Sequence, residues 1–129
     1  MSQRSLIWAA KRGDLAALQT AIRSGAGVDA EDPQGWTALF HAAHHGNTQA
    51  LQLLIDAGAD VNHGRETGFT ALFSAVLDGH VEAVRFLLDA GAEIVPVQGV
   101  DLRCYCIQGN SERHRAILMM LDDYQPRSK

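Results

Sequence analysis

The chain has 129 residues, of which 47% are apolar, and its 11 Lys and Arg against 15 Asp and Glu give a net charge of −4. This balance argues against nucleic-acid or anionic-membrane binding, which depends on neutralising phosphates, and two cysteines cannot form a disulfide framework. No apolar run approaches the about 20 residues that span a bilayer, and Leu6–Ala10 is too short for a signal-peptide core. We therefore expect one domain in the cytoplasm, with no membrane or nucleic acid as partner.

The sequence repeats with a period of 33 residues, which indicates a stack of similar structural units. Segments 35–60 and 68–93 are identical at 13 of 26 aligned positions. The period extends back to Leu6, which aligns with Leu39, and it fades after Pro96. We expect a single domain over residues 1–129, whose units lie at about 4–31, 32–64 and 65–97, with a degenerate closing unit at 98–122 and a tail at 123–129.

Each unit is predicted to contain two short helices joined by a turn. In the second unit, the first helix begins after Thr37, whose hydroxyl can cap it, and ends at Gly46, which suits a left-handed conformation. The second helix begins near Asn47 and ends at Gly58, and residues 59–62 then run outward as a loop or hairpin. The first and third units repeat this pattern.

The helices are expected to bury their apolar faces only when neighbouring units stack. Small residues in the first helices would allow close approach, and larger residues in the second helices would fill the wider gap between them. These predicted packing residues are Ala42, Ala43 and Ala75 in the first helices and Leu53, Leu54, Phe86 and Leu87 in the second.

The runs at 35–43 and 68–75 and the tails at 53–62 and 87–92 resemble the signature of the ankyrin repeat. The resemblance covers about residues 4–96. It implies an all-α solenoid of stacked helix-turn-helix units with protruding loops or hairpins. It also implies a protein without an active site or cofactor, which holds a protein partner on a concave face made by its loops and first helices.

The chain departs from the family pattern in ways that affect its loops. Ala38 and Ala71 replace the usual proline, and Phe40 and Phe73 replace a histidine that normally bridges adjacent loops. Since phenylalanine can only pack, we expect apolar bracing between the loops. The asparagine expected near the end of the third unit is Val95, which is consistent with an atypical closing unit.

The family's contact positions, carried onto this chain, give the candidate partner-binding residues. Two aromatic loop residues, expected about 10 Å apart, are either anchors for the partner or staples between loops. Charge along the helix ends runs from basic to acidic, which would orient a partner unless this is only a solvated face. The candidates are Trp36, Phe69, Lys11, Arg12, His44, His45, Leu77, Asp78, Gln34 and Glu66, and further loop-tip residues are Asp29, Glu31, Asp32, Arg65 and Thr67.

The leading hypothesis is a non-enzymatic protein-interaction module, as an inhibitor or neutraliser of its partner or as an adaptor. The alternative is a metal-binding or pH-sensing protein that uses His41, His44 and His45, because His41 and His45 have a metal-competent spacing and histidine titrates near neutral pH. Cys104 and Cys106 lack the Cys-x-x-Cys spacing and are predicted to pack in the closing unit. We expect a monomer, with self-association through the closing unit left open.

Overall fold

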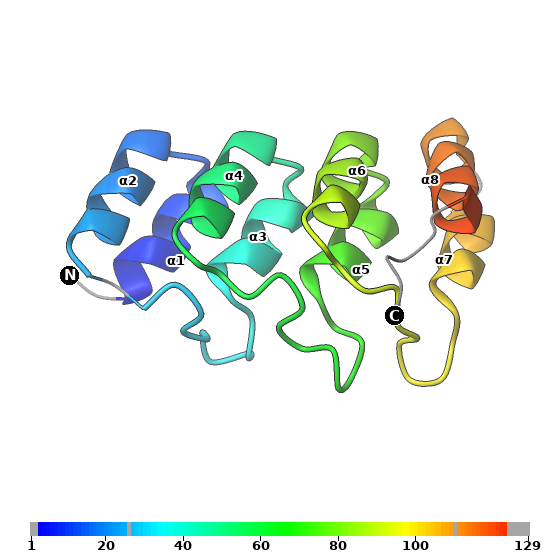
Figure 1. Ribbon diagram of the computed structural model, residues 1–129, viewed down its shortest axis with the longest axis horizontal. Helices are drawn as coiled ribbons and strands as arrows, with labels where there is room; N and C mark the ends of the chain where they lie inside the picture. Colours follow the sequence, from blue (N-terminus) through cyan, green and yellow to red (C-terminus); the bar gives the residue numbers. More distant parts are fainter. Residues whose placement is uncertain (1–2, 26, 110, 124–129) are drawn as a thin grey trace.

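The computed structural model describes residues 3–25, 27–109 and 111–123, which form a row of four helix pairs (Figure 1). In each pair an inner helix packs on the outer helix that follows it, and inner and outer helices also contact their counterparts in the next pair. Loops protrude on one side of the row (Figure 1). The inner helices are α1 (Gln3–Arg12), α3 (Ala38–His44), α5 (Ala71–Asp78) and α7 (Leu102–Gly109), and the outer ones are α2 (Leu15–Arg23), α4 (Thr48–Asp56), α6 (Val81–Asp89) and α8 (Glu112–Asp123).

Threonine hydroxyls cap the N-termini of the two central inner helices, as predicted. The Oγ1 atoms of Thr37 and Thr70 accept hydrogen bonds from the backbone N–H groups of Phe40 and Phe73, at 3.2 Å in each case. Both threonines are buried. Each cap satisfies a helix N–H group that would otherwise have no partner in the protein interior.

The turns between the helices of a pair are held by histidines at the N-terminal ends of the outer helices of the next pair. His80 Nε2 donates to the carbonyl oxygen of His44 at 2.8 Å, and His114 Nε2 donates to that of Leu77 at 3.1 Å. These carbonyls lie at the C-terminal ends of inner helices, where backbone acceptors lack helical partners. Gly46 has a φ of 67°, and a Cβ there would lie 2.7 Å from His80 Nδ1, so glycine permits both the turn and the contact.

Alanines in the inner helices and leucines in the outer helices form one continuous core. Ala42, Ala43 and Ala75 are fully buried, as are Leu54 and Leu87. Small side chains let the inner helices approach closely, and leucines fill the space between outer helices. These packing predictions are therefore confirmed.

Leu53 and Phe86 pack against the core but fill the gap between outer helices only in part. Both are only half-buried and line a shallow hollow of about 450 Å³ on the outer face, together with Leu15. Their positions are one residue before Leu54 and Leu87, which turns their side chains about 100° away from the buried stripe.

A fourth pair, α7 and α8, packs on the third through α5 and α6. Leu102, Cys106, Ile117 and Leu121 are buried and extend the core into this pair. The preceding loop contains an isolated antiparallel bridge between Val97 and Val100. The stack therefore continues beyond the point where the sequence period fades.

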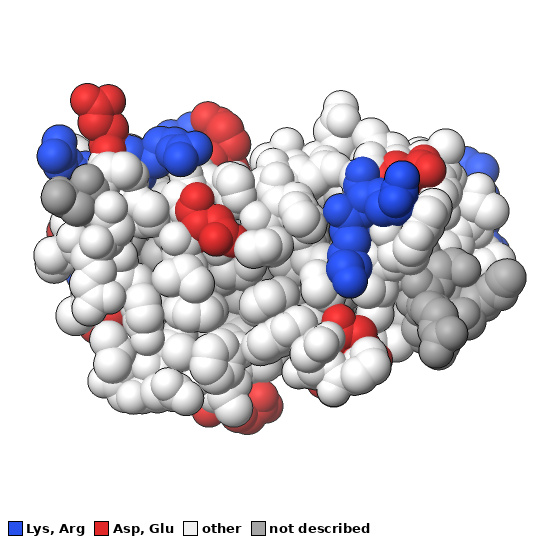
Figure 2. Space-filling view, turned by 180° about the vertical axis from the view of Figure 1, so that it is seen from behind, with Lys and Arg blue, Asp and Glu red and all other residues white. Residues whose placement is uncertain are grey.

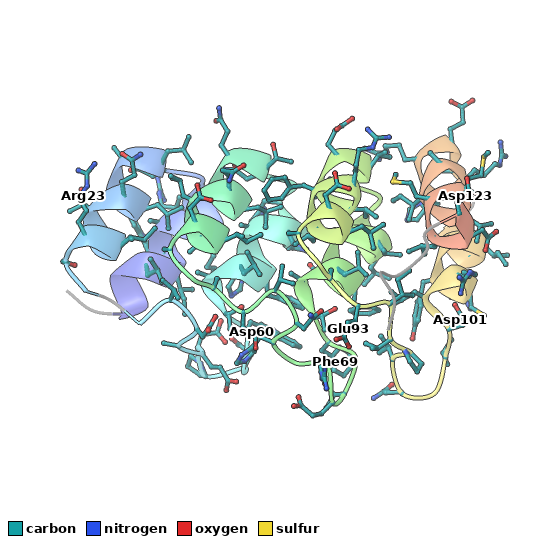
Figure 3. All side chains as sticks on the ribbon, in the orientation of Figure 1. Arg23, Asp60, Phe69, Glu93, Asp101 and Asp123 are labelled. Carbon is teal, nitrogen blue, oxygen red and sulfur yellow. The ribbon has the colours of Figure 1, made fainter. Side chains whose placement is uncertain are left out.

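Polar bonds as well as aromatic contacts brace the loops. Asn62 Nδ2 donates to the Gly91 carbonyl oxygen at 3.2 Å and its Oδ1 accepts from the Glu93 N–H at 2.7 Å. Arg65 Nη1 lies 2.9 Å from Glu93 Oε2, and Figure 3 places Glu93 and Phe69 on the loop side of the stack. The expected apolar bracing is present in the aromatic contacts, but it is incomplete, because asparagine and carboxylate groups at the loop bases also reach the next loop.

The part of the chain that the structure describes contains no helix long and apolar enough to cross a membrane.

A comparison of two glycines tests the close approach between the loop that begins the third unit and the residues that end it. Gly68 and Gly58 both have positive φ, 91° and 97°, but a Cβ at Gly68 would lie 2.3 Å from the backbone oxygen of Pro96, whereas one at Gly58 meets nothing within 4 Å. Gly58→Ala should cost about 1 kcal/mol of unfolding free energy through backbone strain alone. Gly68→Ala should cost about 2 kcal/mol more, since backbone must move. Urea unfolding of both variants measures this; equal losses would contradict the close approach.

Candidate functional site

The last residues of the first three inner helices form a row along one face of the stack. Helices α1, α3 and α5 contact one another in sequence, so the C-terminal residues of each helix lie beside those of the next. Five of these six side chains are exposed and Asp78 is half-buried. We call the following set the helix-end row: Lys11, Arg12, His44, His45, Leu77 and Asp78.

The centre of the helix-end row is linked across two repeats by a histidine and a carboxylate. His44 Nδ1 lies 2.5 Å from Asp78 Oδ2, and the rings of His44 and His45 meet edge to face with centroids 4.9 Å apart. Burial lowers the pKa of His45, and the neighbouring His44, His41 and His80 lower it further, against the opposing effect of Asp78. His45 therefore favours the neutral form, which can donate and accept hydrogen bonds.

His41 belongs to a different environment from its two neighbours. It is buried, and its Nε2 atom lies 2.8 Å from Asp32 Oδ2. Burial raises the pKa of Asp32, but the hydrogen bond with His41 and those from the backbone N–H groups of Trp36 and Gln34 outweigh this and hold the pKa below its usual value. The Asp32 contribution to stability is therefore present above pH 3.8 and is lost as the pH falls through its lowered pKa.

The histidines do not come together as a metal site in the described part of the chain. His41 and His44 are bonded to separate carboxylates on Asp32 and Asp78. Among the described residues, no group of three or more His, Cys, Asp or Glu side chains is placed to hold a metal ion.

The two aromatic loop residues are part of a chain of five rings that crosses the repeats. Trp36 stacks on Phe40 with centroids 4.3 Å apart and meets Phe69 edge-on at 5.9 Å. Phe69 meets Phe73 at 5.5 Å, and Phe73 meets Tyr105 of the closing unit at 5.3 Å. The separation of Trp36 and Phe69 is shorter than the predicted 10 Å because both rings turn toward each other. We call these five residues the aromatic chain.

The loop tips enclose a hollow of about 650 Å³. Gln34 and Glu66, both exposed, lie on its walls, and the half-buried rings of Trp36 and Phe69 are also in the lining. The structure thus divides the predicted contact residues between two places, the loop-tip hollow and the helix-end row.

A second hollow, of about 640 Å³, contains a residue that the sequence analysis did not select. Trp8 is 51% exposed, and the guanidinium carbon of Arg12 lies 5.0 Å from the centre of its ring. Lys11 and Arg12 share the lining with residues 31–34. The repeat aligns Trp8 with His41, which is buried, so the alignment did not mark Trp8 as exposed. The spacing of Trp8, Lys11 and Arg12 at i, i+3 and i+4 places the three on one helix face, and this signal could have found it.

The two cysteines have different surroundings, so the prediction that both pack in the closing unit was half right. Cys106 is buried, and burial raises its pKa to about 11. A thiol with such a pKa stays protonated and behaves as a small apolar group. Cys104 is exposed, because it lies two residues earlier on the helix and therefore on the opposite side.

Residues 6–97 match the family model of ankyrin repeats in three copies. No curated protein matches the chain. The family match ends before α7, so the fourth helix pair is a feature of the structure outside the matched residues.

The aromatic chain predicts that Trp36 stabilises the loops whether or not it also touches a partner. Trp36→Ala should lower the unfolding free energy by about 2 kcal/mol, because two ring contacts are lost. Trp8→Ala, an exposed tryptophan outside the chain of rings, is the control and should cost at most about 0.5 kcal/mol. A double-mutant cycle of Trp36→Ala with Phe69→Ala should give a coupling of about 1 kcal/mol. Additive losses in urea unfolding would show that these rings do not support each other.

Proposed function

Since the chain belongs to the ankyrin-repeat family, we propose that it binds a partner protein on the face formed by its loops and inner helices. Ankyrin repeats generally mediate protein–protein interaction, and the family is typically non-enzymatic. The proposed contact surface consists of the helix-end row together with Trp36, Phe69, Gln34 and Glu66 of the loop-tip hollow.

The observation that carries this proposal is the contrast between buried and exposed positions of the repeats. Many buried positions carry the same residue in the second and third units, as at Thr37 and Thr70 or Leu54 and Leu87. The helix-end row changes from Lys-Arg to His-His to Leu-Asp at equivalent positions. The fold therefore does not require these side chains, which leaves them available for recognition.

The exposure of Leu77 favours a protein, and not a small polar molecule, as the ligand. Its side chain is 48% exposed at the end of α5, beside Asp78 and one repeat from His44. A protein interface needs apolar area at its centre and polar groups around it. An exposed leucine between charged and imidazole groups provides this arrangement, whereas a small polar ligand would gain little from it.

We further propose that binding itself is the activity, with the chain acting as an inhibitor or neutraliser that covers a surface of its partner. The chain would act in the cytoplasm as a monomer. Residues 1–129 would form one domain of four units, and the packing of α7 and α8 on the third unit supports the fourth.

Affinity capture from the native host lysate tests the proposed surface. Leu77→Ser should weaken capture of the partner about tenfold, because an apolar contact at the centre of the interface is lost. Met119→Ser is the matched control, since Met119 is also exposed but lies on the outer helix of the closing unit. It should capture the partner as the wild type does. Equal capture by wild type and Leu77→Ser would place binding on another face.

A further inference from the structure

The hollow beside α1 has an apolar floor and an exposed indole. Ile7 is buried beneath it, Trp8 projects into it, and Pro33 and Gln34 of the following loop form the opposite wall. Its volume of about 640 Å³ is enough for a few side chains. A tryptophan half exposed in such a hollow is a strong candidate for a contact residue, because it buries a large area with little loss of side-chain entropy.

The cations and the carboxylates around this hollow are not paired with one another. Glu31 and Asp32 lie in the loop wall, but each is bonded to a histidine, at 2.7 Å to His63 Nε2 and 2.8 Å to His41 Nε2 respectively. Within residues 3–25, 27–109 and 111–123, Lys11 and Arg12 form no ion pair with a carboxylate. Figure 2 shows basic side chains clustered over the end of the stack that holds α1.

The stacking of Arg12 on Trp8 fixes where the positive charge lies. With the guanidinium carbon over the ring at 5.0 Å from its centre, the cation is held on one face of the indole. A carboxylate that pairs with this guanidinium through two hydrogen bonds would bring its neighbouring residue over the exposed part of the ring. The site therefore selects a charge and an apolar group at a fixed separation.

We propose that this hollow binds an extended segment of the partner protein in which an acidic side chain adjoins an apolar one. This inference rests on the proposed function, and it adds Trp8 and the partner's chemistry to it. Lys11 and Arg12 pair with the carboxylate, and Trp8 and Pro33 contact the apolar side chain. Two cations with carboxylates close by form too small a basic surface for nucleic acid or an anionic membrane.

Selection from a random library of short displayed peptides on the full chain tests the proposal. Enriched peptides should carry Asp or Glu next to a large apolar residue. Trp8→Ser and the double variant Lys11→Gln/Arg12→Gln should each weaken their binding about tenfold, and added salt should weaken binding to wild type more than to the double variant. Arg23→Gln/Arg113→Gln removes the same charge at exposed sites elsewhere and should leave binding unchanged.

The outcomes separate this inference from the proposed function. Peptides without acidic residues, or peptides that bind the Trp8→Ser and Lys11→Gln/Arg12→Gln variants as well as wild type, overturn the inference. If peptides of either kind fail to bind the Leu77→Ser variant, they bind the proposed face, and only the N-terminal hollow is excluded as the site. Binding of RNA or phosphatidylserine vesicles that depends on Lys11 and Arg12 would also overturn it. Thermal unfolding of each variant shows that the fold is retained.

Discussion

Contact between successive helix pairs is the interaction on which the rest of the structure depends. A pair of short helices cannot bury its own apolar face, so each unit is stable only against its neighbours. Alanines such as Ala42 and Ala75 set a close spacing between inner helices, and Leu54 and Leu87 fill the space behind them. This regular spacing aligns the helix ends, and the helix-end row exists only because the pairs stack in register.

The loops convert the stack into a defined surface. The usual histidine of the family motif is replaced here by Phe40 and Phe73, and their rings allow the aromatic chain to run from the second unit to Tyr105 in the closing unit. Polar bonds from Asn62 and Arg65 hold the same loops from their outer side. Trp36 and Phe69 can therefore stabilise the loops and still present exposed edges at the loop-tip hollow, so their two predicted roles are compatible.

The sequence period was sufficient to predict the helices of the first three units, the threonine caps of the second and third, and the glycine turns, because these depend on local chemistry that repeats. It was not sufficient where side-chain direction decides the outcome. The contact of Trp36 with Phe69 depends on side-chain torsion angles, which the sequence period does not determine. The partial exposure of Leu53 and Phe86 and the exposure of Cys104 depend on their angular positions around their helices. Trp8 was missed because the repeat aligns it with His41, which is buried, so the period gave no sign that Trp8 is exposed.

Hydrogen exchange of the backbone amides in a core variant tests the coupling between units most directly. Leu72 is fully buried in α5, and Leu72→Ala should cost about 2–5 kcal/mol. If units are stable only through their neighbours, amides in α3, α4, α7 and α8 should lose protection together with those of α5 and α6. Loss of protection confined to α5 and α6 would contradict the account, because it would show that each helix pair holds its structure alone.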